Sequence, residues 1–173
     1  MTHIAGFVGE FCFARLLTAC HIPQCRFDSL HLVEVAEQCE IGLARIAQAK
    51  PYLISEYGTP TRSSNGSYRI ELDWEQVPIQ VILDKVYGLD AVIFFRGWCI
   101  GIDVTTNPQT LIEKRQKLQR LAPLWQGIGI DHVVVIHLLL QKQSNEMNEP
   151  NTEITNVLRQ VIKKQKKILS LSV

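Results

Sequence analysis

Two aspartates at the ends of adjoining apolar segments are the residues of this sequence whose type and spacing could do chemistry. Asp90 opens the segment "LDAVIFF", and Asp103 lies near the end of the next segment, "WCIGIDVTT". Both segments are rich in β-branched and aromatic residues, and Arg96-Gly97 between them is typical of a tight turn. We therefore predict an antiparallel pair of strands that places the two carboxylates side by side.

Neighbouring carboxylates favour a bound cation. They repel each other unless a cation lies between them or one takes up a proton. Oxygen ligands with positions left open for water and phosphate suit Mg²⁺ or Mn²⁺. Such an ion would stabilise charge on a phosphate and lower the pKa of an attacking water. The alternative is that both aspartates are ordinary strand-end charges that face solvent or cap turns.

The direction of the Asp103 side chain follows from strand alternation. Asp103 shares a face of its strand with Gly101 and Thr105, whereas Ile102 and Val104 point to the other, more apolar side. We therefore expect the carboxylate to lie on the less apolar face of the sheet.

A basic helix is predicted to follow this pair of strands. Asn107-Pro108 starts it, because proline is favoured at the first helical position, and it runs to about Ala122. Its expected buried stripe consists of Leu111, Leu118 and Ala122. At 100° per residue, Lys114 lies about 60° to one side of Leu111, whereas Lys117 lies about 120° away and more toward water. Lys114 is therefore the cation expected to reach the aspartates, and its alternative is a solvated charge paired with a neighbour.

Arg115 falls within the apolar stripe of the same helix. Its aliphatic stem is therefore expected to be buried, with the guanidinium directed at a carboxylate. A structural ion pair and a phosphate contact are both open for this residue.

The remaining elements predict a mixed α/β fold with a central β-sheet flanked by helices. Helices are expected over residues 2–20 and from residue 28 to just before Pro51, followed by a loop over 59–67. A strand with one wet side is expected over 68–74, and residues 77–88 fit either a strand or a short helix. The run "HVVVIHLLL" predicts a strand covered on both faces, returning parallel through a crossover. We expect a single domain over residues 1–173, in which 141–173 form a polar loop and a C-terminal amphipathic helix (154–169).

Composition narrows the class of protein. A net charge of +1 gives no general attraction to nucleic acid, so any such footprint must be local. Five cysteines without a CxxC pair argue against a disulfide framework or a zinc ribbon. Because no run of eighteen apolar residues or leader-like segment occurs, the protein is expected to be soluble and cytoplasmic, without a membrane partner.

The order of elements and the acidic residues resemble the core of the PD-(D/E)xK nuclease superfamily, a restriction-endonuclease-like fold of the order αβββαβ. In that family the second core strand supplies an aspartate, which Asp90 matches. The third carries an acidic residue, any residue and then lysine, and "IDVTT" matches it through Asp103. Many members carry a glutamate near the metal on the first helix, where this chain has Glu10 in "GFVGEFCFARLL". The resemblance covers the topology from Ile4 to Leu140.

The resemblance implies a Mg²⁺- or Mn²⁺-dependent endonuclease-like hydrolase that cuts phosphodiester bonds in DNA. Asp90, Asp103 and Glu10 would then be metal ligands and, with Lys114, carry catalysis. Thr105 stands where the motif has its lysine, but some members move that lysine to the following helix, where Lys114 lies. Arg115 and Lys117 would bind the substrate.

Two other functions stay open. One is a catalytically inactive nuclease-fold protein, in which loss of the strand lysine leaves a nucleic-acid-binding or protein-interaction module, and the near-neutral charge favours it. Alternatively, the chain is a small structural α/β protein. DNA is the expected partner, with RNA as an alternative, and a homodimer through the last helix is a further hypothesis.

Overall fold

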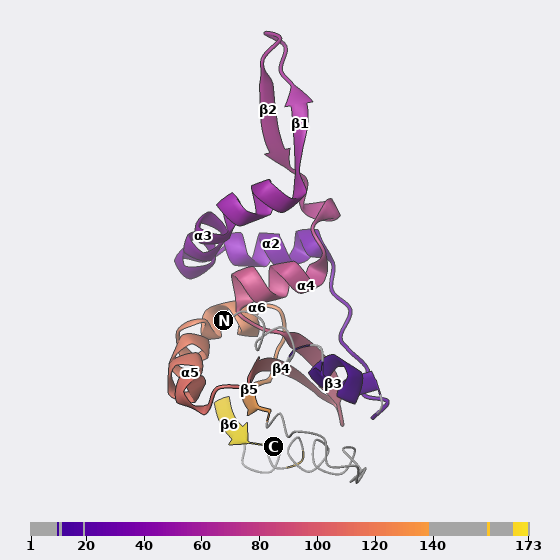
Figure 1. Ribbon diagram of the computed structural model, residues 1–173, viewed down its shortest axis with the longest axis vertical. Helices are drawn as coiled ribbons and strands as arrows, with labels where there is room; N and C mark the ends of the chain where they lie inside the picture. Colours follow the sequence, from indigo (N-terminus) through magenta and orange to yellow (C-terminus); the bar gives the residue numbers. More distant parts are fainter. Residues whose placement is uncertain (1–9, 11, 19, 139–158, 160–167, 173) are drawn as a thin grey trace.

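The computed structural model of the protein describes residues 10, 12–18, 20–138, 159 and 168–172. A four-stranded mixed sheet forms its centre. The strand order is β3-β4-β5-β6 (Figure 1). The strands span Ala91–Phe95 (β3), Trp98–Thr105 (β4), His132–His137 (β5) and Ile168–Ser172 (β6). The predicted mixed α/β class is confirmed.

The predicted pair of strands is β3 and β4. They are antiparallel, with Phe95 opposite Trp98, so Arg96-Gly97 form a two-residue turn. The φ angles of Arg96 and Gly97 are 52° and 86°, and two positive φ values at these positions are those of the tight turn that matches strand twist. The chain then passes through α5 (Leu111–Arg120) and α6 (Ala122–Gly127) to β5, which is parallel to β4 as predicted.

Helical segments cover both faces of the sheet. Residues 10 and 12–18 form a helical segment that lies beside β3, and its Phe13 and Leu17 pack with Val134 and Ile136 of β5 (Figure 1). Val133 and Val135 point the other way, into a second core beneath α2 (Ser29–Glu37), α3 (Glu40–Tyr57), α4 (Ile79–Ile82), α5 and α6. The continuous apolar run of β5 therefore reflects burial on both faces, as predicted.

The second predicted helix is two helices, and its predicted end is wrong. Gln38 and Cys39 separate α2 from α3, because the Cys39 side chain accepts a hydrogen bond from Gly42 N and caps a new helix. Pro51 lies inside α3, which continues to Tyr57. Burial of Ala49 and Leu53 on either side of the proline stabilises the helix beyond it.

A two-stranded ribbon, β1 (Gly58–Arg62) and β2 (Tyr68–Leu72), projects from the end of α3 (Figure 1). The predicted loop over 59–67 is therefore partly a strand. The strand predicted over 68–74 exists, but it belongs to this ribbon and not to the central sheet. The outer part of its expected buried face is open to solvent, with Tyr68 73% and Ile70 60% exposed, whereas Leu72 and Trp74 pack against the core. The three-strand core expected from the family resemblance thus lacks its first strand in the sheet.

Residues 77–88, for which a strand and a helix were both open, are helical. Val77 follows a single 3₁₀ turn, Trp74–Gln76, and α4 continues into a π-helical turn, Leu83–Tyr87. Gly88 then ends the helix in the left-handed conformation, at φ 70°. This end leads directly into Leu89 and Asp90, ahead of β3.

The predicted C-terminal helix (154–169) lies mostly outside the described residues. Its last two positions do not fit the prediction, because Ile168 and Leu169 belong to β6, which pairs in parallel with β5. All five cysteines are free thiols, as expected. In the part of the chain that the structure describes, no helix has both the length and the apolar character needed to cross a bilayer.

Candidate functional site

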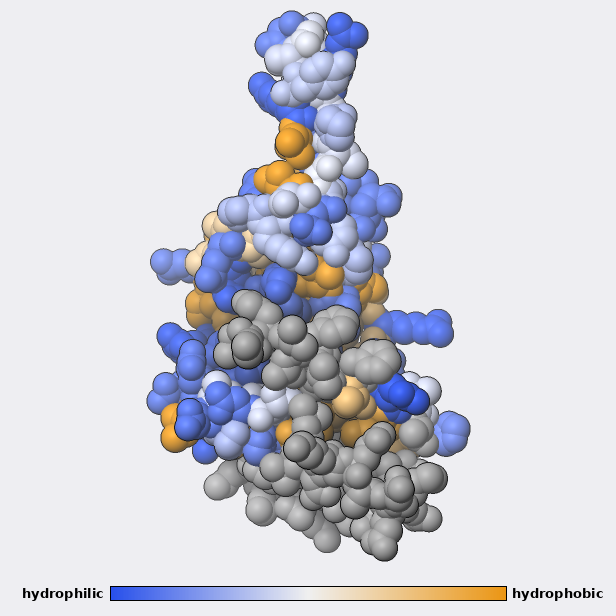
Figure 2. All heavy atoms as spheres, in the orientation of Figure 1, coloured by the Kyte–Doolittle hydropathy of each residue, from blue (hydrophilic) through white to orange (hydrophobic). Residues whose placement is uncertain are grey.

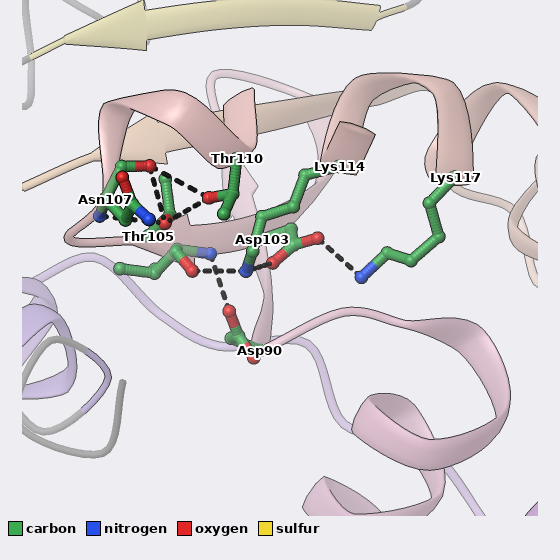
Figure 3. A network of polar contacts seen from close by, with 8 residues as sticks. Asp90, Asp103, Thr105, Asn107, Thr110, Lys114 and Lys117 are labelled. Carbon is green, nitrogen blue, oxygen red and sulfur yellow. Dashed lines mark hydrogen bonds and ion pairs between the residues drawn. The ribbon is translucent and has the colours of Figure 1, made fainter. Parts of the chain in front are cut away.

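Asp103, in β4, is a buried carboxylate held by two lysines of α5 (Figure 3). Its side chain is 2% exposed. Lys114 Nζ donates to Asp103 Oδ1 and, at 2.6 Å, to the carbonyl oxygen of Val104. Lys117 Nζ lies 2.7 Å from Asp103 Oδ2. Because an unpaired buried carboxylate is costly, the two ammonium groups offset the burial of this charge.

The two lysines contact Asp103 differently. Lys114 makes hydrogen bonds, whereas Lys117 makes an ion pair whose geometry leaves Asp103 Oδ2 without an aligned hydrogen bond. Both lysine side chains stay partly open to solvent, at 26% and 33% exposure. The contact of Asp103 Oδ2 with Lys117 is therefore an ion pair without an aligned hydrogen bond.

The prediction for Lys114 fits this arrangement, but that for Lys117 does not. Lys117 was expected to point more toward water, because it lies about 120° from Leu111 when the stripe is taken as Leu111, Leu118 and Ala122. The helix α5 ends at Arg120, and Leu121, which follows it, is buried instead. This rotates the buried stripe toward Lys114 and Lys117 and brings both to the sheet. Arg115 lies on the exposed side of α5, so the expected burial of its stem is wrong.

Asp90 lies beside Asp103 because the backbone and the side chain of Asp90 both form hydrogen bonds with β4, just before β3 begins. Asp90 N donates to the carbonyl of Ile102 at 2.8 Å, and Val104 N donates to Asp90 Oδ2 at 2.5 Å. Gln80 in α4 donates to the Asp90 carbonyl. The two carboxyl groups are thus placed by adjacent strand positions, as the sequence predicted.

Burial and, after it, the charge of Asp103 raise the pKa of Asp90 to about 7, against the opposing effects of the Val104 hydrogen bond and Lys114. Asp90 therefore exchanges a proton near neutral pH, whereas Asp103 has two cations beside it.

Glu10 lies near Asp90 across a small hollow. The hollow has a volume of about 240 Å³, and its wall includes Glu10, Gln80, Asp90 and side chains of the N-terminal helical segment. Partial burial is the main cause that raises the pKa of Glu10, followed by the nearby charge of Asp84, while Lys114 and Lys85 lower it. Among the described residues, however, no three His, Cys, Asp or Glu side chains lie close enough together to hold one metal ion. A role of Glu10 as third ligand therefore requires its side chain to move.

The donor atoms around Asp103 suit a hard divalent cation. Asp90, Asp103 and the Val104 carbonyl offer oxygen ligands, and Asp103 Oδ2 is buried without an aligned hydrogen bond. The Lys114 ammonium contacts two of these oxygens, Asp103 Oδ1 and Val104 O. A cation bound to the same atoms would thus require Lys114 to shift.

Thr105, at the position of the motif lysine, fixes the start of the next helical segment. Its hydroxyl accepts a hydrogen bond from Asn107 N at 3.1 Å and lies 2.8 Å from the hydroxyl of Thr110 (Figure 3). Asn107 caps the 3₁₀ turn Pro108–Thr110, close to the predicted helix start. This network orients α5 relative to β4 and so positions Lys114 over Asp103.

Two other parts of the site were not anticipated. These are the Val104 carbonyl and Gln80, because backbone acceptors carry no sequence signal and residues 77–88 had no assigned structure.

A groove between α3 and α5 adjoins the site through Lys117. It has a volume of about 760 Å³ and is lined on one side by Arg45 and Gln48 and on the other by Glu113, Lys117 and Arg120. The Arg45 guanidinium is fixed by the carbonyls of Lys85 and Val86. Three cations and one carboxylate give the groove a basic lining.

Comparison of the chain with protein-family models finds no match, and neither curated proteins nor solved structures give one. The function must therefore be argued from the site itself.

Proposed function

We propose that this protein is a Mg²⁺- or Mn²⁺-dependent endonuclease-like hydrolase of the PD-(D/E)xK type that acts on DNA. The observation that supports the proposal most strongly is the meeting of Asp90, Asp103 and Lys114 where β3 begins and β4 ends. The resemblance requires two carboxylates and a lysine close together. Here adjoining strand ends supply the two carboxylates, and α5 supplies the lysine in place of the strand.

In this proposal Asp90 and Asp103 hold the ion, together with the Val104 carbonyl, and Glu10 approaches across the hollow. A bound Mg²⁺ supplies charge stabilisation for the phosphate and an activated water. Lys114 supplies positive charge beside the attacked phosphate, within reach of Asp103.

The basic groove supports a polyanionic substrate. Lys117 lies both at Asp103 and in the wall of the groove, so a phosphate chain bound along Lys117 and Arg120 would lead to the carboxylates. Arg115, exposed on the same helix, would add a further phosphate contact from outside the groove. DNA is proposed as the substrate because the resemblance implies it.

A second candidate is a catalytically inactive protein of the same fold that binds nucleic acid or protein. The observation in its favour is the Lys114 ammonium, which contacts Asp103 Oδ1 and Val104 O, two oxygens that a metal ion would need. In this case the lysine replaces the ion permanently and the site is structural.

Cleavage of plasmid and single-stranded DNA with Mg²⁺ or Mn²⁺ tests the first proposal. We expect Asp103→Asn to lower the rate at least a hundredfold, because the ligand charge is lost while the side-chain shape is kept. Asp28→Asn is the matched control, since Asp28 caps α2 and asparagine caps a helix equally well. Cleavage that survives Asp103→Asn unchanged would mean a different site or a contaminating nuclease.

Lys114→Met separates the two candidates. If Lys114 acts beside the ion, cleavage is lost while Mn²⁺ affinity, measured by titration calorimetry, stays within several-fold of wild type. If the ammonium replaces the ion, the wild type neither cleaves nor binds Mn²⁺, and the variant gains Mn²⁺ binding, because the oxygens of Asp103 and Val104 are released.

A further inference from the structure

The β1–β2 ribbon is an element that the proposed site does not use. It projects from the body at the end of α3, away from the central sheet (Figure 1). Gly58 joins it closely to α3, since Gly58 N donates to Ile54 O and a Cβ at Gly58 would lie 2.4 Å from that oxygen and 2.5 Å from the Ile70 side chain. The ribbon therefore leaves the body in a direction fixed by the end of a helix.

The tip of the ribbon is an ordered polar loop. Ser63 N donates to Ser67 O at 2.8 Å, and the Asn65 side chain accepts from both the backbone and the hydroxyl of Ser67. On the face shown in Figure 2 the far end of the ribbon is hydrophilic. A pre-formed loop of hydroxyl and amide groups can donate to and accept from a polar partner at little entropic cost.

The charge of the ribbon is of one sign along most of its length. From Thr59 to Ile70 it carries Arg62 and Arg69 and no acidic residue, and Glu71 at the base of β2 is its one carboxylate, although the whole chain has a net charge of only +1. Both arginines are exposed, and neither takes part in an ion pair among the residues that the structure describes. Their register positions, Arg62 opposite Tyr68 and Thr61 opposite Arg69, place one arginine on each face.

We infer that the β1–β2 ribbon inserts into the major groove of duplex DNA, with Arg62 and Arg69 directed to phosphates or base edges on its two sides. A two-stranded ribbon fits the width of this groove, and arginine is the side chain best suited to both kinds of contact. Tyr68 and Ile70 are also exposed on the ribbon, and exposed apolar side chains of this kind could instead bind a protein. The arginines on both faces, and the absence of acidic residues from Thr59 to Ile70, favour DNA. This inference rests on the proposed function, since it assigns the ribbon a hold on the same substrate.

The test is binding of the full chain to a labelled 30-bp duplex in EDTA, so that binding is measured without cleavage. We expect Arg62→Ala/Arg69→Ala to weaken binding by about tenfold to a hundredfold near 0.1 M salt, and to make the slope of log K against log salt shallower by roughly 2. Arg26→Ala/Arg96→Ala is the matched control, because it removes two exposed arginines from elsewhere on the molecule. Circular dichroism and thermal melting verify the fold of both variants.

A duplex RNA of the same sequence sharpens the test. The major groove of A-form RNA is deep and narrow, so a ribbon that reads a major groove should contribute to DNA binding and not to RNA binding. We expect the ribbon variant to bind duplex RNA like the control variant. Equal losses on DNA and RNA, or equal losses in the ribbon and control variants, would overturn insertion into the groove.

The remaining outcomes separate this inference from the proposed function. A wild-type chain that binds no DNA at all defeats both. DNA binding without metal-dependent cleavage, still weakened by the ribbon variant, supports the ribbon and defeats only the nuclease. A wild-type dimer that Tyr68→Ser/Ile70→Ser dissociates, while ribbon and control variants bind DNA equally, assigns the ribbon to a second copy of this chain and overturns the inference.

Discussion

Two regions of this protein each present a pair of cationic side chains, in opposite physical settings. At the end of β4, Lys114 and Lys117 converge on the buried carboxylate of Asp103. On the β1–β2 ribbon, Arg62 and Arg69 lie exposed, and neither takes part in an ion pair among the residues that the structure describes. The first pair offsets a charge inside the fold, whereas the second pair is exposed and open to a charge on another molecule.

This difference shows why net charge is a poor guide to the partners of this chain. Lys114 and Lys117 count toward the net charge of +1, but both form ion pairs with Asp103, whose negative charge partly neutralises theirs. The ribbon arginines count equally toward the total and remain available to a polyanion. Stability should therefore depend on the first pair and association on the second.

Replacing each pair by methionine gives the largest expected contrast. Lys114→Met/Lys117→Met leaves a buried carboxylate without its cations, so we expect the free energy of unfolding at pH 7 to fall by about 3–5 kcal/mol. Arg62→Met/Arg69→Met should change it by no more than about 0.5 kcal/mol, because the ribbon arginines are exposed. Urea unfolding followed by circular dichroism measures both. Similar losses in the two variants would contradict the proposed contrast.

The pH dependence of stability is the next largest effect. The pKa of Asp90 is raised from 3.8 to about 7 in the folded protein, so the folded state binds more protons than the unfolded state between these values. Its contribution to stability is complete below about pH 4 and is lost as pH rises through about 7. We expect Asp90→Asn, which cannot ionise, to stabilise the protein at pH 8 by about 2–4 kcal/mol relative to its effect at pH 5.

Denaturant unfolding of wild type and Asp90→Asn across pH 5–8 checks this expectation, with Asp28→Asn as the control for loss of an exposed aspartate. If Asp90→Asn changes the free energy of unfolding by the same amount at every pH in this range, folding does not raise the pKa of Asp90.

Loss of the Thr105 hydroxyl should lower stability less, but it should also disturb the position of Lys114 beside Asp103. Thr105→Val removes the acceptor for Asn107 N and the contact with Thr110, so we expect a loss of about 1–2 kcal/mol in the free energy of unfolding. Because these contacts orient α5, the contact of Lys114 with Asp103 and any metal-dependent cleavage should change as well. Thr61→Val, on the ribbon, is the control substitution and should alter neither property.

The smallest expected effect is on the fold of the ribbon itself. Ser63→Ala, the control, removes one hydroxyl from the tip loop, whereas Asn65→Ala removes the acceptor of two hydrogen bonds from Ser67. We expect Asn65→Ala to cost about 0.5–1.5 kcal/mol locally. Amide hydrogen exchange should show faster exchange in β1 and β2, with unchanged protection in β4 and β5. Faster exchange in β4 as well would show that the ribbon and the sheet unfold together.

Much of the candidate site follows from local sequence. Arg96-Gly97 predicts the turn between β3 and β4, the strand period predicts the face of Asp103, and Asn107-Pro108 predicts the start of the helical region near Lys114. Each of these depends on near neighbours in the chain, where turn chemistry and side-chain period act directly.

The parts that could not be predicted depend on distant contacts. The alternation of Tyr68, Ile70 and Leu72 is the same whether a strand packs on a core or projects into solvent, so the ribbon could not be separated from the sheet. The orientation of Lys117 depends on where α5 ends against Leu121. The parallel pairing of Ile168 with Val133 joins segments far apart in the sequence.

The ends of the ribbon have a consequence for the modularity of the chain. Gly58 and Leu72 are opposite each other in the first position of the β1–β2 register, so the chain leaves the body and returns to it at nearly the same point. A short linker could therefore replace the whole ribbon while α3, the central sheet and the Asp103 site keep their connections. The ribbon behaves as an insertion that a lineage could gain, lose or exchange independently of the chemistry at the end of β4.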